Sequence, residues 1–143
     1  MTARERVATG AMLTVVIALL LVGVVSGTIL RHAVQVTPAL VATVVVVRQP
    51  VWSRFAAIAV FAFWLLIMLL IWLYLLGLAN VITGRFTLVE VILTIVIGLA
   101  CVAGLAVTVG RPVRWSGLFA CVMSGALQVG AMWLSLQPAL ANR

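Results

Sequence analysis

The sequence predicts an all-α protein, a polytopic bundle of transmembrane helices, and three observations support that prediction. Of the 143 residues, 66% are hydrophobic and only 8% are charged, whereas about one quarter of the residues in a soluble domain are charged. The stretch from Phe55 to Ile82 has no charged residue and no proline, and it is longer than the roughly 20 residues that cross a bilayer. Because no connecting segment is long enough to fold as a soluble domain, we expect residues 1–143 to form a single transmembrane domain.

The first apolar run follows Arg4, Glu5 and Arg6, an arrangement that resembles the charged and hydrophobic regions of a signal peptide. The run is somewhat long for that role and further apolar runs follow it, so we expect an uncleaved first helix with a cytoplasmic N-terminus. Gly23 and Gly27 form a GxxxG pair, which allows two helices to approach closely. Alternatively, Gly27 ends the first helix, as glycine commonly does.

The second apolar run, residues 29–47, decides the number of spans. If the turn falls at residues 26–28, this run is just long enough to cross, with Arg31 and His32 reaching the outer interface. If the turn follows His32, the run is too short and four spans remain as the alternative. With the N-terminus inside, five spans agree with the positive-inside rule and four reverse it. The five-span arrangement places Arg4, Arg6, Arg48, Arg54, Arg111 and Arg114 inside and Arg31, Arg85 and Arg143 outside.

We therefore predict five spans with the N-terminus inside and the C-terminus outside, at about 7–27, 29–47, 55–82, 88–109 and 117–137. Before the fourth span, Thr87 and Glu90 have the spacing of a capping box. A carboxylate in the first turn of a helix also suits the helix dipole.

Small residues predict how the later spans pack. Gly117, Cys121 and Gly125 form one stripe on the fifth span, and Ala126 and Gly130 form an adjacent one. A matching stripe on the fourth span contains Ala100, Gly104 and Thr108. Because small residues favour close approach in lipid, we expect spans four and five to pack together.

Gln128 lies near mid-membrane, one turn from Ser124. An amide at that depth needs a hydrogen-bond partner, so we expect it to bond a neighbouring helix. Cys101 and Cys121 both fall inside apolar runs, where a free cysteine behaves as a small hydrophobe, so we expect core packing rather than a disulfide.

The two inner loops resemble each other. Segments 48–53 and 111–116 share Arg, Trp and Ser at the same spacing, which is compatible with a duplication of two-helix units. Short cytoplasmic turns also favour Arg, Pro and Trp without any duplication. Because basic residues at the membrane surface attract anionic lipid headgroups, we name four candidates for this role: Arg48, Arg54, Arg111 and Arg114.

Few residues can carry chemistry. Glu90 is the only acidic residue beyond the N-terminal tail and His32 is the only histidine, so a proton relay through these two is conceivable. Their interfacial positions and the capping role of Glu90 explain both without a function. One histidine and two buried cysteines do not supply a structural zinc site, and no haem-attachment motif is present.

One face of the long apolar stretch carries bulky side chains at helical spacing: Phe61, Trp64, Met68 and Trp72. Such a stripe is compatible with a lipid tail, quinone or pigment, or with a partner subunit, but we favour plain packing or contact with lipid. The candidates for cofactor contacts are therefore His32, Trp64, Met68 and Trp72. We predict no specific cofactor and no metal.

The predicted function is that of a small non-catalytic membrane protein, an accessory or assembly subunit that packs against a larger complex. The alternative is a small oligomeric transporter, channel or lipid carrier. The expected partners are a bilayer with anionic lipids and either a membrane protein or further copies of the chain. The basic residues lie between apolar runs rather than on one patch, which argues against nucleic acid. The Arg-rich, Lys-free composition favours a bacterial inner membrane.

Overall fold

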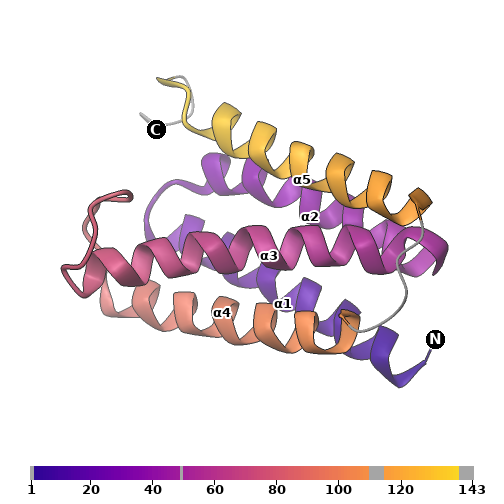
Figure 1. Ribbon diagram of the computed structural model, residues 1–143. Coiled ribbons are helices and arrows are strands. Elements are labelled where there is room, and N and C mark those ends of the chain that lie inside the picture. Colours follow the sequence, from indigo (N-terminus) through magenta and orange to yellow (C-terminus); the bar gives the residue numbers. More distant parts are fainter. Residues whose placement is uncertain (1, 49, 110–114, 139–143) are drawn as a thin grey trace.

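The computed structural model describes residues 2–48, 50–109 and 115–138, and every regular element in these ranges is an α-helix (Figure 1). The prediction of an all-helical protein is confirmed. The helices are α1 Ala3–Val25, α2 Ile29–Arg48, α3 Pro50–Leu75, α4 Leu88–Thr108 and α5 Trp115–Ser135. All five contain a segment long and apolar enough to cross a membrane, so the protein has the architecture of a multi-pass membrane protein.

Helix α3 is the central element of the bundle. It packs against α2, α4 and α5, while α1 packs mainly against α2 and α4, and α2 also contacts α5. Figure 1 shows α3 running between α4 and α5. We call the end near Arg54 and Thr108 the packed end, and the end near the 26–28 turn and the α3–α4 connection the cavity end.

The turn between α1 and α2 lies at residues 26–28, as the five-span prediction requires. Gly27 has φ 68°, a conformation that favours glycine, and the Thr28 N–H donates to the Gly23 carbonyl over 2.8 Å. This pattern is a Schellman motif, so Gly27 ends the helix. Gly23 is the close contact of the pair, because a Cβ there would lie 2.8 Å from the His32 Cβ.

The predicted C-terminal end of the long span was wrong. Helix α3 ends at Leu75 and not near Ile82, because Gly77 has φ 71° and the Leu78 N–H bonds to the Leu73 carbonyl over 2.8 Å. This is a second Schellman motif. The apolar residues after Gly77 therefore belong to the connection to α4, which runs across the cavity end.

The predicted capping box before α4 is confirmed. The Thr87 hydroxyl accepts from the Glu90 N–H, and the Glu90 carboxylate accepts from the Thr87 N–H. Helix α1 begins with the same motif, made by Thr2 and Glu5. In both cases the side chains bond N–H groups that have no partner inside the helix.

The predicted pairing of spans four and five was wrong. In the described chain, α4 packs against α1 and α3, and α5 packs against α2 and α3. A Cβ at Gly104 would collide with the Phe61 ring, and one at Gly117 would collide with the Phe55 ring. The glycines therefore receive large aromatic rings from α3 instead of a second small-residue stripe.

This arrangement also bears on the duplication with which the two inner loops are compatible. Helices α2 and α3 pack as a pair, whereas α4 and α5 do not, so the two units lack the same helix pairing.

Cys101 is buried in α4 and Cys121 is partly buried in α5, and both thiols are free. Gly125 makes no close contact, because nothing lies within 4 Å of a Cβ placed there.

The packed end holds two of the four predicted lipid-headgroup candidates within the described residues. Arg54 donates through Nε to the Thr108 carbonyl at the end of α4, and its guanidinium lies 5.3 Å from the centroid of the Phe55 ring. A cation at a helix C-terminus suits the helix dipole, so Arg54 has a structural role. Arg48 is exposed. Arg111 and Arg114 lie outside the described residues.

Candidate functional site

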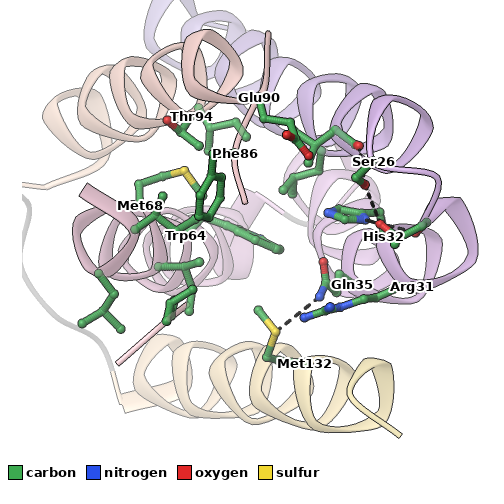
Figure 2. Close-up of a pocket in the computed structure, with 18 of the residues that line it drawn as sticks. Ser26, Arg31, His32, Gln35, Trp64, Met68, Phe86, Glu90, Thr94 and Met132 are labelled. Carbon is green, nitrogen blue, oxygen red and sulfur yellow. Dashed lines mark hydrogen bonds between the residues drawn. The ribbon is translucent and has the colours of Figure 1, made fainter. Parts of the chain in front are cut away.

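A cavity of about 540 Å³ lies between the helices at the cavity end, and all five helices contribute to its lining. Its size falls within the roughly 300–1,000 Å³ of small-molecule sites. We call it the inter-helix cavity. Figure 2 looks into it and shows the labelled side chains converging from the 26–28 turn, from α2, α3, α4 and α5, and from the α3–α4 connection.

The apolar wall of the cavity is built around Trp64 and Met68 of α3. Both belong to the predicted bulky stripe, and they are only 2% and 3% exposed. Phe86, Ile97 and Met132 extend this wall on neighbouring elements. Trp72, the remaining cofactor candidate on α3, is partly buried against the core and does not line the cavity.

The first turns of α2 supply the polar side of the cavity through Arg31, His32 and Gln35. His32 is placed by its own turn, because its Nδ1 lies 3.1 Å from both the hydroxyl and the carbonyl oxygen of Thr28. Gly23 allows α1 to approach the His32 side chain closely. The close approach at the 26–28 turn thus brings the polar start of α2 against the other helices.

Gln35 joins α2 to α5. Its Nε2 donates to the Ser135 hydroxyl over 2.9 Å and approaches the Met132 sulfur at 3.4 Å. Ser135 in turn donates to the Met132 carbonyl over 2.7 Å. Because Gln35 and Ser135 are buried, this pair fixes the position of α5 beside the cavity.

Glu90 reaches the cavity from the first turn of α4 and is 7% exposed. Its Oε2 accepts from the Thr87 N–H over 2.7 Å and from the Thr87 hydroxyl over 2.8 Å. His32 lines the same cavity, so the structure brings together the two residues of the hypothetical proton relay. No hydrogen bond joins them among the described residues, and the relay stays a hypothesis.

The α3–α4 connection covers part of the cavity. Val81, Ile82, Thr83 and Phe86 belong to its lining. Tyr74 holds this segment, because its hydroxyl donates to the Gly84 carbonyl over 3.0 Å and its ring lies 6.1 Å from that of Phe86. Because α3 ends at Leu75, the residues that follow it form the connection that covers part of the cavity.

Two hydrogen-bond donors at the cavity have no partner in the described chain. They are the Nε of Arg31 and the Nε1 of Trp64, and both atoms are buried. Buried polar groups are normally satisfied by protein, water or a ligand. This cavity therefore offers donors to a molecule that carries hydrogen-bond acceptors.

The prediction that Gln128 bonds a neighbouring helix was wrong. Its side chain is 1% exposed, and both its amide nitrogen and its amide oxygen are without a partner in the described residues. The bond between α5 and α3 is made one turn earlier, where the Ser124 hydroxyl donates to the Ala56 carbonyl over 3.3 Å. The stretch of α3 from Phe55 to Phe63 has no side chain that can donate or accept a hydrogen bond.

Sequence reasoning identified His32, Trp64, Met68 and Glu90 separately, but it missed their common cavity. It placed Arg31 at the membrane interface and did not single out four other lining residues, Gln35, Phe86, Thr94 and Met132. One signal was available. Arg31, His32 and Gln35 lie within two turns at the start of an apolar helix, and polar and ionisable residues in such a helix usually face the interior of a bundle.

The inter-helix cavity therefore has an apolar wall and a polar side. The described residues contain no group of three or more His, Cys, Asp or Glu side chains placed to hold a metal ion. No protein-family model, curated protein or solved structure matches the chain.

Proposed function

We propose that this protein is a non-catalytic multi-pass membrane protein that binds a small amphiphilic molecule in the inter-helix cavity, as a lipid carrier does. The observation that carries the proposal is the division of the cavity. Trp64 and Met68 form an apolar wall, and Arg31, His32 and Glu90 line the same space. Small-molecule sites commonly combine an apolar lining with a few polar groups that orient the ligand.

The distribution of arginines supports an orientation for this function. In our proposal the N-terminus lies in the cytoplasm and the C-terminus outside, in a bacterial inner membrane. The inter-helix cavity then opens near the outer face. The exposed Arg48 at the opposite end attracts anionic lipid headgroups on the cytoplasmic side.

The test is native mass spectrometry of the protein after extraction in a mild nonionic detergent. We expect the wild type to retain one amphiphile for each chain. Thr94→Phe should empty the cavity, because Thr94 is 4% exposed and lines it. The matched control is Thr14→Phe, since Thr14 is exposed on α1 and also donates to its own helix backbone, as Thr94 does. A wild type without any adduct, or a Thr94→Phe variant with undiminished adduct, would contradict the proposal.

An accessory or assembly subunit is the second candidate, and one observation favours it. Gly125 and Gly130 of α5 have nothing within 4 Å of a Cβ placed on them, and Ala126 is exposed beside them. This leaves small residues available for a helix of a partner protein. Co-purification after mild extraction tests the idea, with Gly130→Leu expected to release the partner and Gly98→Leu, at a similarly open position of α4, expected to retain it. A chain that runs alone, or only with copies of itself, contradicts this candidate.

A further inference from the structure

Two opposite charges line the inter-helix cavity without pairing. Arg31 reaches it from α2 and Glu90 from α4, and Figure 2 shows both side chains directed into the space between the helices. No ion pair joins them in the part of the chain that the structure describes. Charged groups withdrawn from water are normally paired, so each of the two is available to an oppositely charged group of a ligand.

Glu90 has one oxygen committed and one available. Both hydrogen bonds to its carboxylate end on Oε2 and come from Thr87, and no described residue bonds to Oε1. These contacts orient the carboxylate without neutralising its charge. Because the residue is 7% exposed, Oε1 favours a cation that enters the cavity.

Arg31 and Trp64 provide the complementary side. The Nε of Arg31 and the Nε1 of Trp64 are both buried, with no acceptor among the residues that the structure describes, and Trp64 is only 2% exposed. Charge-assisted bonds from arginine to phosphate or carboxylate are stronger than bonds between neutral groups. This pair of donors therefore favours an anionic group on the ligand.

We propose that the inter-helix cavity selects an amphiphile with a zwitterionic headgroup. The anionic group lies on Arg31 and Trp64, and the ammonium lies on Glu90. One positive and one negative side chain leave the cavity with no net charge from this pair, so a headgroup with a single charge leaves one of them unpaired. The inference deepens the proposed function and rests on it, because it assigns the class of molecule that the cavity binds.

The apolar wall at Trp64 and Met68 assigns this headgroup to a lipid and not to a free polar zwitterion. Phosphatidylethanolamine has the required phosphate and ammonium, and phosphatidylglycerol with the same acyl chains has the phosphate alone. Free phosphoethanolamine has the headgroup without chains. Delipidated protein in nonionic detergent is titrated with each probe, and bound molecules are counted by native mass spectrometry.

We expect the wild type to bind phosphatidylethanolamine at least tenfold more tightly than phosphatidylglycerol and to bind free phosphoethanolamine more weakly than either lipid. Glu90→Gln should reverse the lipid preference, since the remaining Arg31 favours an anion. Glutamine also serves in a capping box, so this variant keeps the start of α4. Arg31→Gln should weaken both lipids and favour a cationic amphiphile such as dodecylamine.

Matched controls exist for both variants. Glu5→Gln changes the corresponding residue in the capping box of α1, away from the cavity. Arg85→Gln removes an exposed arginine from the α3–α4 connection. Both controls should keep the preference of the wild type.

The outcomes separate this inference from the proposed function. If no probe binds, both fail. If lipids bind and Thr94→Phe blocks them, but the wild type shows no preference for phosphatidylethanolamine, the zwitterion inference is overturned and the proposed function stands. Tighter binding of free phosphoethanolamine than of the lipid also overturns the assignment to a lipid.

Discussion

The two halves of α3 carry similar bulky side chains and yet have opposite surroundings. In the half at the packed end, the rings of Phe55 and Phe61 lie on Gly117 and Gly104. In the other half, Trp64 and Met68 face a cavity. A stripe of large apolar residues therefore indicates close packing only where the facing helices present glycine.

The cavity stays open because its polar side chains are held at its edges. Glu90 is bonded to Thr87 at the start of its own helix, and His32 is bonded to Thr28 within its own turn. Gln35 is drawn to Ser135 on α5. Each of these bonds keeps a long side chain near the wall, so the space in front of Trp64 is not filled. In the packed half, the rings of Phe55 and Phe61 occupy the space beside Gly117 and Gly104 instead.

The largest effect on stability is expected from placing a side chain at Gly104, where α4 contacts the Phe61 ring. Gly104→Leu forces a side chain into the Phe61 ring, which is fully buried, and should destabilise the bundle by about 3 kcal/mol. Thermal unfolding in detergent measures this. Gly98→Leu on the same helix has open space around it and should leave the unfolding temperature unchanged or raise it, since leucine is the better helix former. Equal losses of stability in Gly104→Leu and Gly98→Leu would contradict the difference in packing between the two positions.

Removing the unsatisfied amide of Gln128 should raise the free energy of unfolding, whereas Gly104→Leu should lower it. Gln128→Leu replaces two buried polar atoms that have no partner in the described part of the chain with an apolar side chain of similar size, and should stabilise the protein by about 1–2 kcal/mol. Gln137→Leu is the control, because that side chain lies at the end of the bundle and bonds the Trp133 carbonyl in an exposed position. Its effect should stay within about 0.5 kcal/mol. A destabilised Gln128→Leu variant would show that the amide has a partner.

The bond that joins α2 and α5 beside the cavity should contribute less. Ser135→Ala removes the acceptor of the Gln35 amide and should cost about 1 kcal/mol in the free energy of unfolding. Ser26→Ala also removes a hydroxyl that bonds its own helix backbone, but at an exposed position, and should cost less. An unchanged unfolding temperature for Ser135→Ala would mean that α5 is not fixed by this bond.

The smallest effect on stability is expected from Tyr74→Phe, beside the α3–α4 connection that covers the cavity. Tyr74→Phe removes the exposed hydrogen bond to Gly84 but keeps the ring beside Phe86. A loss of about 0.5 kcal/mol should make amide hydrogen exchange in residues 76–87 roughly twofold faster. Exchange in the 26–28 turn should not change. Acceleration in both turns would indicate general loosening of the bundle.

Much of the fold could be predicted from the sequence because local signals determine it. Apolar length and the positions of the arginines indicated five helices, Gly27 offered a helix end as one of two alternatives, and the spacing of Thr87 and Glu90 indicated a cap. The end of α3 was missed because residues 76–82 contain no charged residue and no proline, and Gly77 and Asn80 were the local signals.

The pairing of helices and the cavity depend on contacts distant in sequence. The small residues of α4 and α5 indicated close approach but not the partner, which is the aromatic side of α3. Likewise, Arg31, Trp64 and Glu90 belong to three helices, and nothing in the sequence places them around one space. Gln128 also lacks, within residues 2–48, 50–109 and 115–138, the hydrogen-bond partner that its depth led us to expect.

Entry of a lipid chain into the inter-helix cavity can be measured most directly at Trp64. A variant that retains Trp64 as its single tryptophan, with phenylalanine at Trp52, Trp72, Trp115 and Trp133, is titrated with phosphatidylethanolamine that has brominated acyl chains. A matched variant retains only Trp133, which is 66% exposed and reports contact with surrounding lipid.

We predict that the brominated lipid quenches Trp64 fluorescence, and that Thr94→Phe abolishes this quenching while Trp133 remains quenched in its own variant. If Trp64 fluorescence stays constant while Trp133 is quenched, no chain enters the inter-helix cavity, and the central claim is contradicted.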